Sequence, residues 1–421
     1  MKRILLSVFA AAVTVAWTAP ASADVTFNGE YRARGEYRNN QDFNDTDTVA
    51  DDDNRAFIGQ RIRLTANAQA SDDVSVKITL QDTRLFGADG TNGLLTDTQQ
   101  TNQQVDIHEA YLNVTNIFDT PVNFRIGRQE LNYGDQRLIG SFGWSNNARA
   151  FEGLKFNYVQ DGINVDLFRM TLTETTSATA GSNDDTTLTG VYATLGQLIP
   201  NNTLDVYLLN VHTGVGGGTI GDERYTIGAR LAGSAAGLDY TVEFPYQFGE
   251  VSNTVDIKAW ALAAKVGYTI PGAPMNLRIG AEYDYATGDD NPNDNDNETF
   301  NQLFPTNHGH FGIGDVVNTW SDIQAWSLNA SADISEKLRV YVAYWNYTEN
   351  EATGVDHGST TGAGADDELG SEIDLVATYK YNNNLTIEAG AARFMPGDGI
   401  TPAGTSDDDQ DWAYLQITAK F

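Results

Sequence analysis

Residues 25–38, VTFNGEYRARGEYR, alternate between two kinds of side chain along their whole length. The odd-numbered positions are apolar, aromatic or glycine, as at Phe27 and Tyr31, whereas every even-numbered position from Glu30 to Arg38 is charged. A repeat of two residues is the period of a β-strand, whose successive side chains point to opposite faces. A strand in a soluble core would not place a row of charges on one face. This stretch therefore predicts a strand with one apolar face and one wet face.

The same alternation recurs along the chain and gives eighteen segments in all. Most of them have about 9–13 residues, the length that a tilted strand needs to cross a bilayer. No stretch after the N-terminus reaches 18 consecutive apolar residues, so helical membrane spans are excluded. The predicted strands are 25–38, 55–71, 74–85, 105–114, 122–131, 151–159, 162–173, 187–196, 203–212, 223–233, 237–249, 256–268, 275–286, 322–334, 338–349, 371–381, 384–394 and 411–421.

The connections between these segments alternate between short and long. Short ones include 72–73, 160–161, 233–237, 333–337 and 381–384, and long ones include 39–54, 86–104, 132–150, 174–186, 287–321, 350–370 and 395–410. Up-and-down barrels of the outer membrane have short periplasmic turns and long extracellular loops, whereas a soluble β-sandwich shows no such alternation. The sequence thus predicts an all-β, transmembrane, up-and-down antiparallel β-barrel of about 18 strands, formed by residues 24–421 as a single domain.

The first 23 residues have the pattern of a signal peptide. Lys2 and Arg3 precede an apolar stretch at 4–17, and Ala21 and Ala23 supply the small residues at a cleavage site. The apolar stretch is too short to span a membrane comfortably. Residues 1–23 are therefore predicted to direct export. With the barrel pattern, they predict the outer membrane of a Gram-negative bacterium as the location.

The composition narrows the functional class. The 421 residues contain 57 acidic and 26 basic side chains, a net charge of −31, and no cysteine. Nucleic-acid binding needs a basic surface and is not expected, and disulfides and cysteine-ligated metals are excluded. A mean hydropathy of −0.37 resembles that of a soluble protein. Strands that present only alternate residues to lipid account for this value. The excess acid is concentrated in the predicted outer loops.

Arginines gather on the wet faces of the first strands. Arg32 and Arg34 face the same side as Arg61 and Arg63 on the next strand, so the four are predicted to line one wall of the lumen. Arg125 and Arg128 are predicted to extend this wall, and Glu30 and Glu109 to pair with it. Arginine ladders set the field in many general porins, so a generic role in selectivity competes with dedicated binding of a sugar acid.

The segment after the fifth predicted strand allows another interpretation. Residues 125–140, RIGRQELNYGDQRLIG, fit an inward-folded loop that plugs the pore and is held by arginine–acid pairs. In that case Tyr133-Gly134-Asp135 serves as turn chemistry. Both interpretations, a substrate-selecting wall and a structural plug, remain open from the sequence.

This same segment carries a resemblance. Residues 125–140, followed by Trp144, Asn147, Arg149 and the Phe151-Glu152-Gly153 strand start, resemble the signature of the alginate export family of outer-membrane porins. Glu30-Tyr31-Arg32-Ala33-Arg34 and Glu109-Ala110-Tyr111-Leu112 are similar to it as well. These motifs cover roughly residues 25–155, and beyond them only the strand rhythm is shared.

The resemblance implies an eighteen-stranded barrel whose arginine-lined lumen passes a polyuronate outward. Its lumen arginines, transferred by motif, are Arg32, Arg34, Arg125, Arg128, Arg137 and Arg149. The acidic outer loops depart from this picture, because they would repel a polyanion that entered from outside. They do not oppose export if a basic constriction lies deeper.

One stretch of a predicted loop has the oxygen ligands of a calcium site. Asp290, Asp294, Asp296 and Glu298 alternate along it, without the glycine and glutamate spacing of an EF-hand. Calcium at these residues competes with a solvated acidic loop that divalent ions bridge to lipopolysaccharide. No other cofactor and no other metal is expected.

Catalysis is not expected. None of the five histidines stands beside a recognisable nucleophile motif, and Gly-x-Ser-x-Gly is absent. The sequence instead predicts a channel, a monomer among outer-membrane lipid and lipopolysaccharide, for hydrophilic solutes. Export of an anionic polysaccharide such as alginate is the first hypothesis. Uptake of small solutes through a general or substrate-preferring porin is the alternative, and a filled barrel without conductance is a third.

Overall fold

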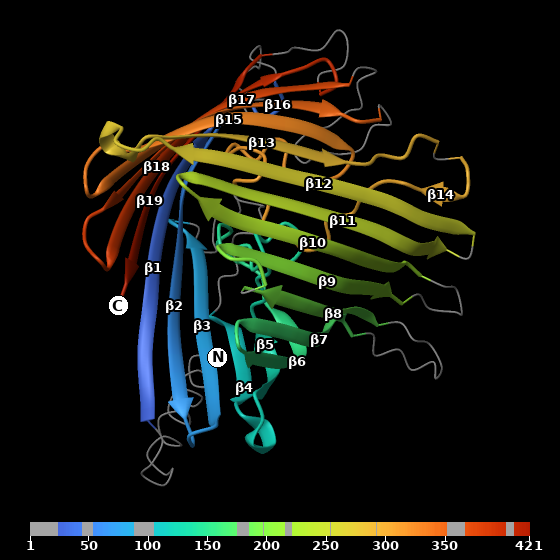
Figure 1. Cartoon of the computed structure of the whole chain (residues 1–421). Coiled ribbons are helices and arrows are strands. Elements are labelled where there is room, and N and C mark those ends of the chain that lie inside the picture. Colours follow the sequence, from blue (N-terminus) through green and yellow to red (C-terminus); the bar gives the residue numbers. More distant parts are fainter. Residues whose placement is uncertain are drawn as a thin grey trace.

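The computed structural model describes residues 24–43, 54–87, 105–174, 185–196, 198–214, 221–252, 254–291, 293–351, 367–400 and 408–421. Its strands form one closed sheet (Figure 1). They are β1 (Asp24–Arg38), β2 (Arg55–Gln69), β3 (Val74–Leu85), β4 (Asp106–Val114), β5 (Val122–Gln129), β6 (Phe151–Gln160), β7 (Ile163–Thr173), β8 (Thr186–Leu195), β9 (Asn202–Thr213), β10 (Glu223–Ala235), β11 (Leu238–Ser252), β12 (Val255–Thr269), β13 (Arg278–Ala286), β14 (Asp296–Asn297), β15 (Ile323–Asp333), β16 (Leu338–Glu349), β17 (Glu368–Lys380), β18 (Leu385–Pro396) and β19 (Gln410–Lys420).

Each long strand pairs antiparallel with its neighbours in the sequence, and β1 pairs with β19 to close the barrel. The two-residue β14 stands apart from this order: it pairs parallel with the start of β12, and β13 pairs directly with β15. Eighteen strands therefore make the wall, which confirms the predicted fold and strand number. The predicted strand bounds agree with the observed ones to within about three residues.

Helices are nearly absent from the described part of the chain. The short 3₁₀ turns η1 (Ile117–Asp119) and η2 (Pro274–Asn276) lie in connections between strands. No helix among the described residues has the length and apolar character needed to cross a membrane. The predicted signal peptide, residues 1–23, and the acidic run at 51–53 lie outside the described residues.

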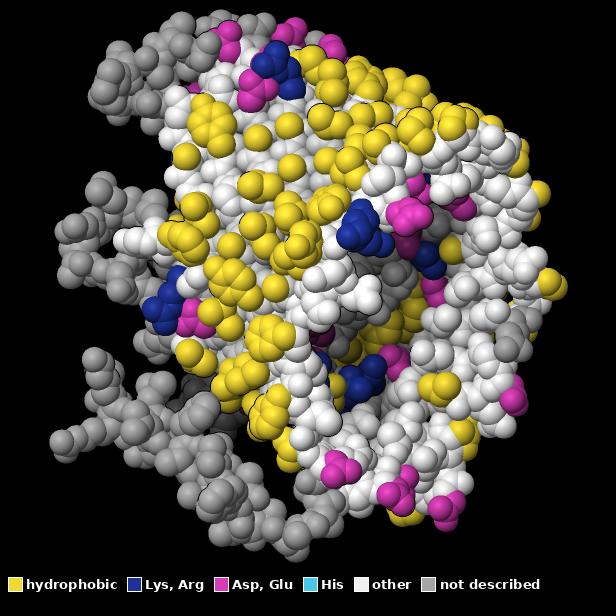
Figure 2. All heavy atoms as spheres, turned by 90° about the vertical axis from the view of Figure 1, so that its left-hand side faces the viewer, with side chains coloured by type: hydrophobic (Ala, Val, Ile, Leu, Met, Phe, Trp, Pro, Cys, Tyr) yellow, Lys and Arg dark blue, Asp and Glu magenta, His cyan; other side chains and the backbone are white. Residues whose placement is uncertain are grey.

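The two faces of the wall differ as the alternation predicts. Outward side chains such as Leu328 and Ile227 are more than half exposed, because lipid rather than protein covers them. Figure 2 shows hydrophobic side chains spread over this outer face, beside a hollow with charged side chains at its edge. Only the outward-facing residues of each strand contact the lipid, and these are mostly apolar. This explains the modest mean hydropathy of the chain.

The buried core lies inside the barrel. Most of its side chains come from the inward faces of β6 to β9, β12, β13 and β15 to β18, and from two long connections, 130–150 and 299–321. Trp320, Trp345 and Tyr347 are among the largest of these fully buried side chains. The prediction that 132–150 and 287–321 are simply extracellular loops is therefore wrong for these stretches, because both fold into the lumen. Their apolar side chains gain more by packing against the strands than by exposure to water.

Candidate functional site: the lumen and its two inward loops

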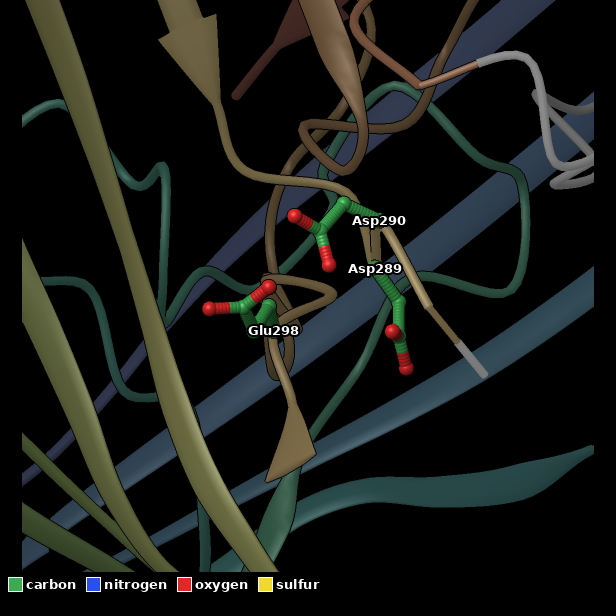
Figure 3. Close-up of side chains that lie close together, drawn as sticks. All are labelled: Asp289, Asp290 and Glu298. Atoms are coloured by element: carbon green, nitrogen blue, oxygen red, sulfur yellow. The ribbon is translucent and has the colours of Figure 1, made fainter. Parts of the chain in front are cut away.

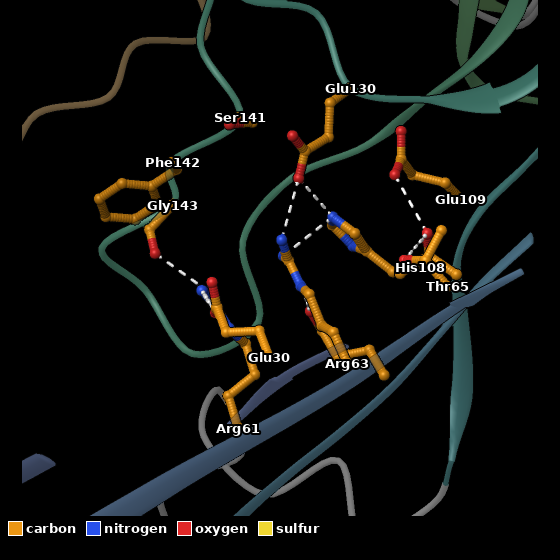
Figure 4. Close-up of polar contacts among 12 residues, drawn as sticks. Glu30, Arg61, Arg63, Thr65, His108, Glu109, Glu130, Ser141, Phe142 and Gly143 are labelled. Atoms are coloured by element: carbon orange, nitrogen blue, oxygen red, sulfur yellow. Dashed lines mark hydrogen bonds and ion pairs between the residues drawn. The ribbon is translucent and has the colours of Figure 1, made fainter. Parts of the chain in front are cut away.

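The first inward loop, residues 130–150, lies against arginines of β1 and β2. Figure 4 shows its contact with Arg61 of β2. Arg32 and Arg61 both donate to the carbonyl oxygen of Gly143, at 2.8 Å and 3.0 Å. Arg61 also donates to the Ser145 carbonyl at 3.0 Å. Hydrogen bonds from a charged donor are shorter and stronger than neutral ones. The arginine wall therefore holds the tip of this loop.

The strand register places like charges side by side on this wall, and the loop supplies oxygen acceptors for them. Arg32 stands directly opposite Arg61, so two guanidinium groups share one face a few ångströms apart. Glu30 accepts from Arg61 at 2.7 Å, and Asn146 of the loop accepts from Arg32 at 2.7 Å. The two arginines are only 4% and 5% exposed. They line the lumen wall as predicted, but the loop separates them from solutes.

Arg34 joins the wall to an aromatic side chain of the loop. It donates to the Trp144 carbonyl at 2.9 Å, and its guanidinium carbon lies 3.8 Å from the centre of a Trp144 ring. The other side of Trp144 contacts His308 of the second inward loop, with ring centroids 3.6 Å apart and nearly parallel planes. Trp144 thus lies between a cation and an imidazole, and links both loops to β1.

A second polar group fixes the start of the loop (Figure 4). Arg63 bonds to Glu130 at 3.3 Å and to His108 at 2.9 Å, and His108 contacts Glu130 at 2.6 Å. Burial alone would raise the pKa of Glu130, but the hydrogen bond with His108 and the charge of Arg63 lower it overall. Glu130 is therefore ionised at neutral pH and ties the first loop residue to β2 and β4.

Glu109 lies on the lumen side as predicted, and so does its neighbour His108. Successive residues normally face opposite ways, but the β3–β4 register shifts between Thr79 and Leu80, and this bulge turns both side chains inward. Glu109 accepts from Lys77 at 2.6 Å and from Thr79 at 3.2 Å.

The segment Tyr133–Arg137 attaches the loop to the opposite wall. Tyr133 donates to Asp166 of β7 at 2.7 Å, and its ring stacks between Phe168 and Tyr192. Burial and the Asp166 carboxylate raise the pKa of Tyr133, so that the phenol keeps its proton. Gly134 has a φ of +52°, and an added Cβ would meet Tyr192 Oη at 3.0 Å. The turn therefore requires glycine for both reasons.

The charged residues of the same segment bind acids and bases of distant strands. Asp135 pairs with Arg230 of β10. Arg137 pairs with Glu282 and, at 2.9 Å, with Asp284, both on β13, and its side chain is 1% exposed. Burial would lower the pKa of Arg137, but the charges of Asp284 and Glu282 outweigh it and raise the pKa. The segment thus bridges the lumen from β7 to β13.

The second inward loop closes over the first. Phe304 of the second loop forms two backbone hydrogen bonds with the first loop: Gly140 donates to the Phe304 carbonyl, and Phe304 donates to the Leu138 carbonyl, both at 2.8 Å. Arg149 donates to the Pro305 carbonyl at 2.9 Å and to the Gly140 carbonyl at 3.2 Å. Burial lowers the pKa of Arg149. Arg137 and Arg149 were predicted to line the pore, and the structure places both inside the packed loops.

The far end of the second loop rests on two buried acids of β17. The Gly314 amide donates to Glu372 at 2.9 Å, and the Ile313 amide donates to Asp374 at 3.5 Å. The Tyr347 hydroxyl of β16 donates to the Phe311 carbonyl at 2.8 Å. Gly312 has a φ of +84°, and an added Cβ would lie 2.2 Å from a Glu372 oxygen. Arg38 of β1 completes the attachment by donating to the Gly314 carbonyl at 2.7 Å.

Arg128 corrects the prediction, because it does not face the lumen. It stands opposite Glu152 on β6 and bonds to it at 2.8 Å, and the two side chains are 36% and 63% exposed. Its neighbours on the same side, Ile126 and Leu154, are exposed lipid-facing residues. Arg125 and Arg128 are three positions apart, so strict alternation sends them to opposite faces. Only Arg125 extends the lumen wall.

On the short-turn side of the loops, the wall of β3 to β6 carries partly exposed basic side chains. Arg125 stands opposite both Asn113 and Lys155, and its guanidinium carbon lies 4.2 Å from the Tyr111 ring. Lys77 stands opposite Tyr111. Lys155 pairs with Asp166 at 3.0 Å, whereas the bond of Arg125 goes to the neutral Asn113 side chain at 3.3 Å. We call Lys77, Arg125 and Lys155 the basic strip.

Three carboxylates of the β13–β15 connection converge in a different place (Figure 3). Asp289, Asp290 and Glu298 have oxygens within 4.8 Å of one another. Slight burial and the nearby carboxylates, Asp290 first, raise the pKa of Glu298. The structure thus brings together Asp290 and Glu298 of the predicted calcium set, but not Asp294 and Asp296. Asp296 pairs with Lys258, and Asp294 accepts from the Asp296 amide. Calcium binding stays a prediction, with Asp289 as an additional ligand.

Several residues of the site are missing from the prediction. Lys77 and Lys155 alternate onto the wet face of their segments, so the sequence contains the signal that places them in the lumen. Asp166, Arg230 and His108 carry no such signal for their role. Their function depends on partners in the inward loop. The path of that loop through the lumen is not encoded by a local sequence pattern.

A closed eighteen-stranded barrel with an apolar outer face and an inward-folded loop is an outer-membrane channel, located in the outer membrane of a Gram-negative bacterium. Its sequence matches the profile of the family described as alginate export over residues 23–414. The chain therefore belongs to the alginate export family, as the resemblance predicted.

Solved structures support the same fold. OccK9 (OpdG) of Pseudomonas aeruginosa has a TM-score of 0.63 at 14% identity, with 94% of this chain and 99% of that chain covered. OccK3 (OpdO) of the same organism gives 0.62 at 15% identity, covering 94% and 96%. OprD, also from this organism, gives 0.59 at 12% identity, covering 94% and 95%. Identities this low show the fold alone. Curated protein sequences contain no match to the chain.

Proposed function

We propose that this channel passes hydrophilic anions of the sugar-acid type, and that the basic strip is where they first bind. Arg125 carries the proposal, because its guanidinium lies on the lumen wall beside Lys155 and its hydrogen bond goes to an amide rather than a carboxylate. A guanidinium fork binds a carboxylate with two parallel hydrogen bonds. The neighbouring Tyr111 ring and the asparagines at 113 and 157 offer the hydroxyl and amide groups that sugar hydroxyls need.

Export of an anionic polysaccharide is the form of this function that the family name suggests. The basic strip lies on the short-turn side of the inward loops, so a polymer from the periplasm would meet it before the loops. Uptake of small solutes remains the second candidate. Residues 130–150 pack tightly against 299–321, so a long polymer passes only if these loops move. This packing favours the small-solute candidate.

The proposal also covers the oligomeric state, the cofactors and the membrane contacts of the chain. The channel acts as a monomer, needs no cofactor, and contacts lipid and lipopolysaccharide with its outer face. It is a transport protein and not an enzyme, in keeping with its fold and family. Histidine–acid contacts such as His108–Glu130 and His308–Asp315 serve to attach the loops.

Planar-bilayer recording tests the proposed function. In a KCl gradient, the reversal potential is expected to show anion preference, and a periplasmic-side oligouronate is expected to reduce the current. Replacing Lys77, Arg125 and Lys155 by glutamine should lower the anion-to-cation permeability ratio severalfold and weaken the block by the oligouronate. The matched control is Arg84→Gln, which removes a positive charge from the outer face of β3.

Each outcome decides between the candidates. Unchanged selectivity in the triple variant, together with no oligouronate block in the parent channel, would refute the proposal. Block by the oligomer with free passage of the monomeric uronate would support the small-solute candidate. Translocation of the oligomer into the opposite chamber, measured chemically, would support export.

A further inference from the structure

Charged side chains on the outward face of the barrel are confined to one end. Within the described strands they all lie toward the long loops. They are Asp82 and Arg84 on β3, Arg128 on β5, Glu152 on β6, Arg169 on β7, Glu223 on β10, Glu250 on β11, Asp256 and Lys258 on β12, Glu368 on β17, Arg393 on β18 and Asp411 on β19. A charge on the lipid face is costly at the bilayer midplane and nearly free of cost at the interface. This end therefore lies at the level of the outer-leaflet headgroups.

Most of these basic groups have a carboxylate partner beside them. Arg84 bonds to Asp82 with two nitrogens at 2.7 Å each, and Arg393 bonds to Asp411 in the same manner. Lys258 bonds to Asp296 at 2.6 Å. These pairs are neutral as units, so they need no further anion.

The sector from β5 to β8 differs, because two arginines share one acid. Arg128 Nη1 bonds to Glu152 at 2.8 Å, and its Nε is buried without a hydrogen-bond partner. Arg169 stands opposite Leu154, two positions along β6 from Glu152, so it is a diagonal neighbour of that acid. Its hydrogen bond goes to the Thr189 hydroxyl at 3.5 Å. Among the described residues, the group Arg128–Glu152–Arg169 therefore carries one positive charge that no further acid is seen to compensate.

The surroundings of this group face lipid. Ile126, Leu154, Leu167 and Val191 lie beside it on the same outward face, and all are exposed. An uncompensated guanidinium at the edge of an apolar surface is stabilised by an anion that is itself anchored in the bilayer. Arginine favours phosphate, because its planar fork donates two parallel hydrogen bonds to phosphate oxygens.

We propose that Arg128 and Arg169 bind a phosphate group of the outer-leaflet glycolipid, lipopolysaccharide. The acyl chains of that lipid lie along Ile126, Leu154, Leu167 and Val191, and the Thr189 hydroxyl stands next to Arg169 as an additional donor. Glu152 holds Arg128 in place rather than neutralising the whole group. This site is independent of the solute that the lumen carries, since both arginines face away from it.

Native mass spectrometry of the detergent-solubilised full chain tests the site. Rough lipopolysaccharide without O-polysaccharide is the probe, and the double variant R128Q/R169Q is expected to bind it at least fivefold more weakly. The variant R84Q, which alters a neutralised arginine on the same face, should bind as the parent does. Removing the phosphates from lipid A should weaken its binding to the parent channel. The loss should equal the loss that the double variant shows with phosphorylated lipid A.

Two further measurements keep the outcome unambiguous. Heat-modifiable migration in detergent gels reports whether each variant is folded, and the single-channel conductance of R128Q/R169Q should equal that of the parent. Equal binding of lipopolysaccharide by the parent and the folded double variant would overturn the proposal. So would equal binding of the dephosphorylated lipid, or displacement of the lipid by millimolar inorganic phosphate, which would indicate a general anion site.

Discussion

Replacing Arg137 by methionine is expected to raise the single-channel conductance at least twofold. Arg137 is the fully buried cation that pairs with Glu282 and Asp284, and its removal leaves both carboxylates without that partner inside the barrel. Removing one member of a buried ion pair costs about 3–5 kcal/mol. The cost falls on the docking of residues 130–150, because the wall itself is held by strand pairing. The loop should therefore leave the lumen part of the time.

Two controls separate this effect from general damage to the barrel. Arg84→Met removes an arginine of the outer face and should leave the conductance unchanged. The triple variant R137M/E282Q/D284N removes the buried charges together, and the conductance should return toward that of the parent. A folded R137M channel with parental conductance, and with no new protease cleavage in 130–150, would show that the ion pair does not hold the loop.

Shortening the tip of the same loop is expected to turn the channel strongly anion-selective. When residues 142–147 are replaced by two glycines, Arg32, Arg34 and Arg61 lose the carbonyl groups that cover them. Their charges then face water in the lumen, where low-dielectric walls strengthen the field that an ion meets. The anion-to-cation permeability ratio from reversal potentials should rise severalfold, together with the conductance.

The comparison variant carries the same shortened tip with R32Q and R61Q. Its conductance should stay high, whereas its anion selectivity should fall back, because the exposed arginines are the cause of the selectivity. If the shortened channel conducts more but shows unchanged selectivity, the arginine wall has no electrostatic role in permeation and serves only to attach the loop.

The wall of the barrel was predictable because each strand carries its own signal. Period-two alternation marks the lipid face residue by residue, and short turns fix where strands end, so each of the eighteen long strands appears near its predicted range. The alternation also contains the correct placement of Arg128, although the prediction put this residue on the lumen wall together with Arg125. It fails at His108 and Glu109, since a bulge changes the period locally.

The path of the inward loops was not predictable to the same degree. The arginines and acids within 125–140 suggested a plug. Residues 125–129 instead belong to β5 of the wall, and only the part of the segment after Gln129 folds into the lumen. Its contacts, however, join residues more than 100 positions apart, such as Arg32 with Gly143 and Arg137 with Glu282. No local pattern contains such pairings, because they depend on which strand of a closed cylinder lies opposite another.

Closure of the cylinder through β1 and β19 has a consequence for assembly. The pairing from Glu30–Lys420 to Arg38–Trp412 joins the two ends of the sequence, so it forms only after the last strand has been synthesised. Until then the growing sheet has two unpaired edges, each able to pair with another chain. The entropy of joining such distant segments also makes this step slow. Until β1 and β19 meet, the sheet thus exposes two edges that are prone to pair with other chains.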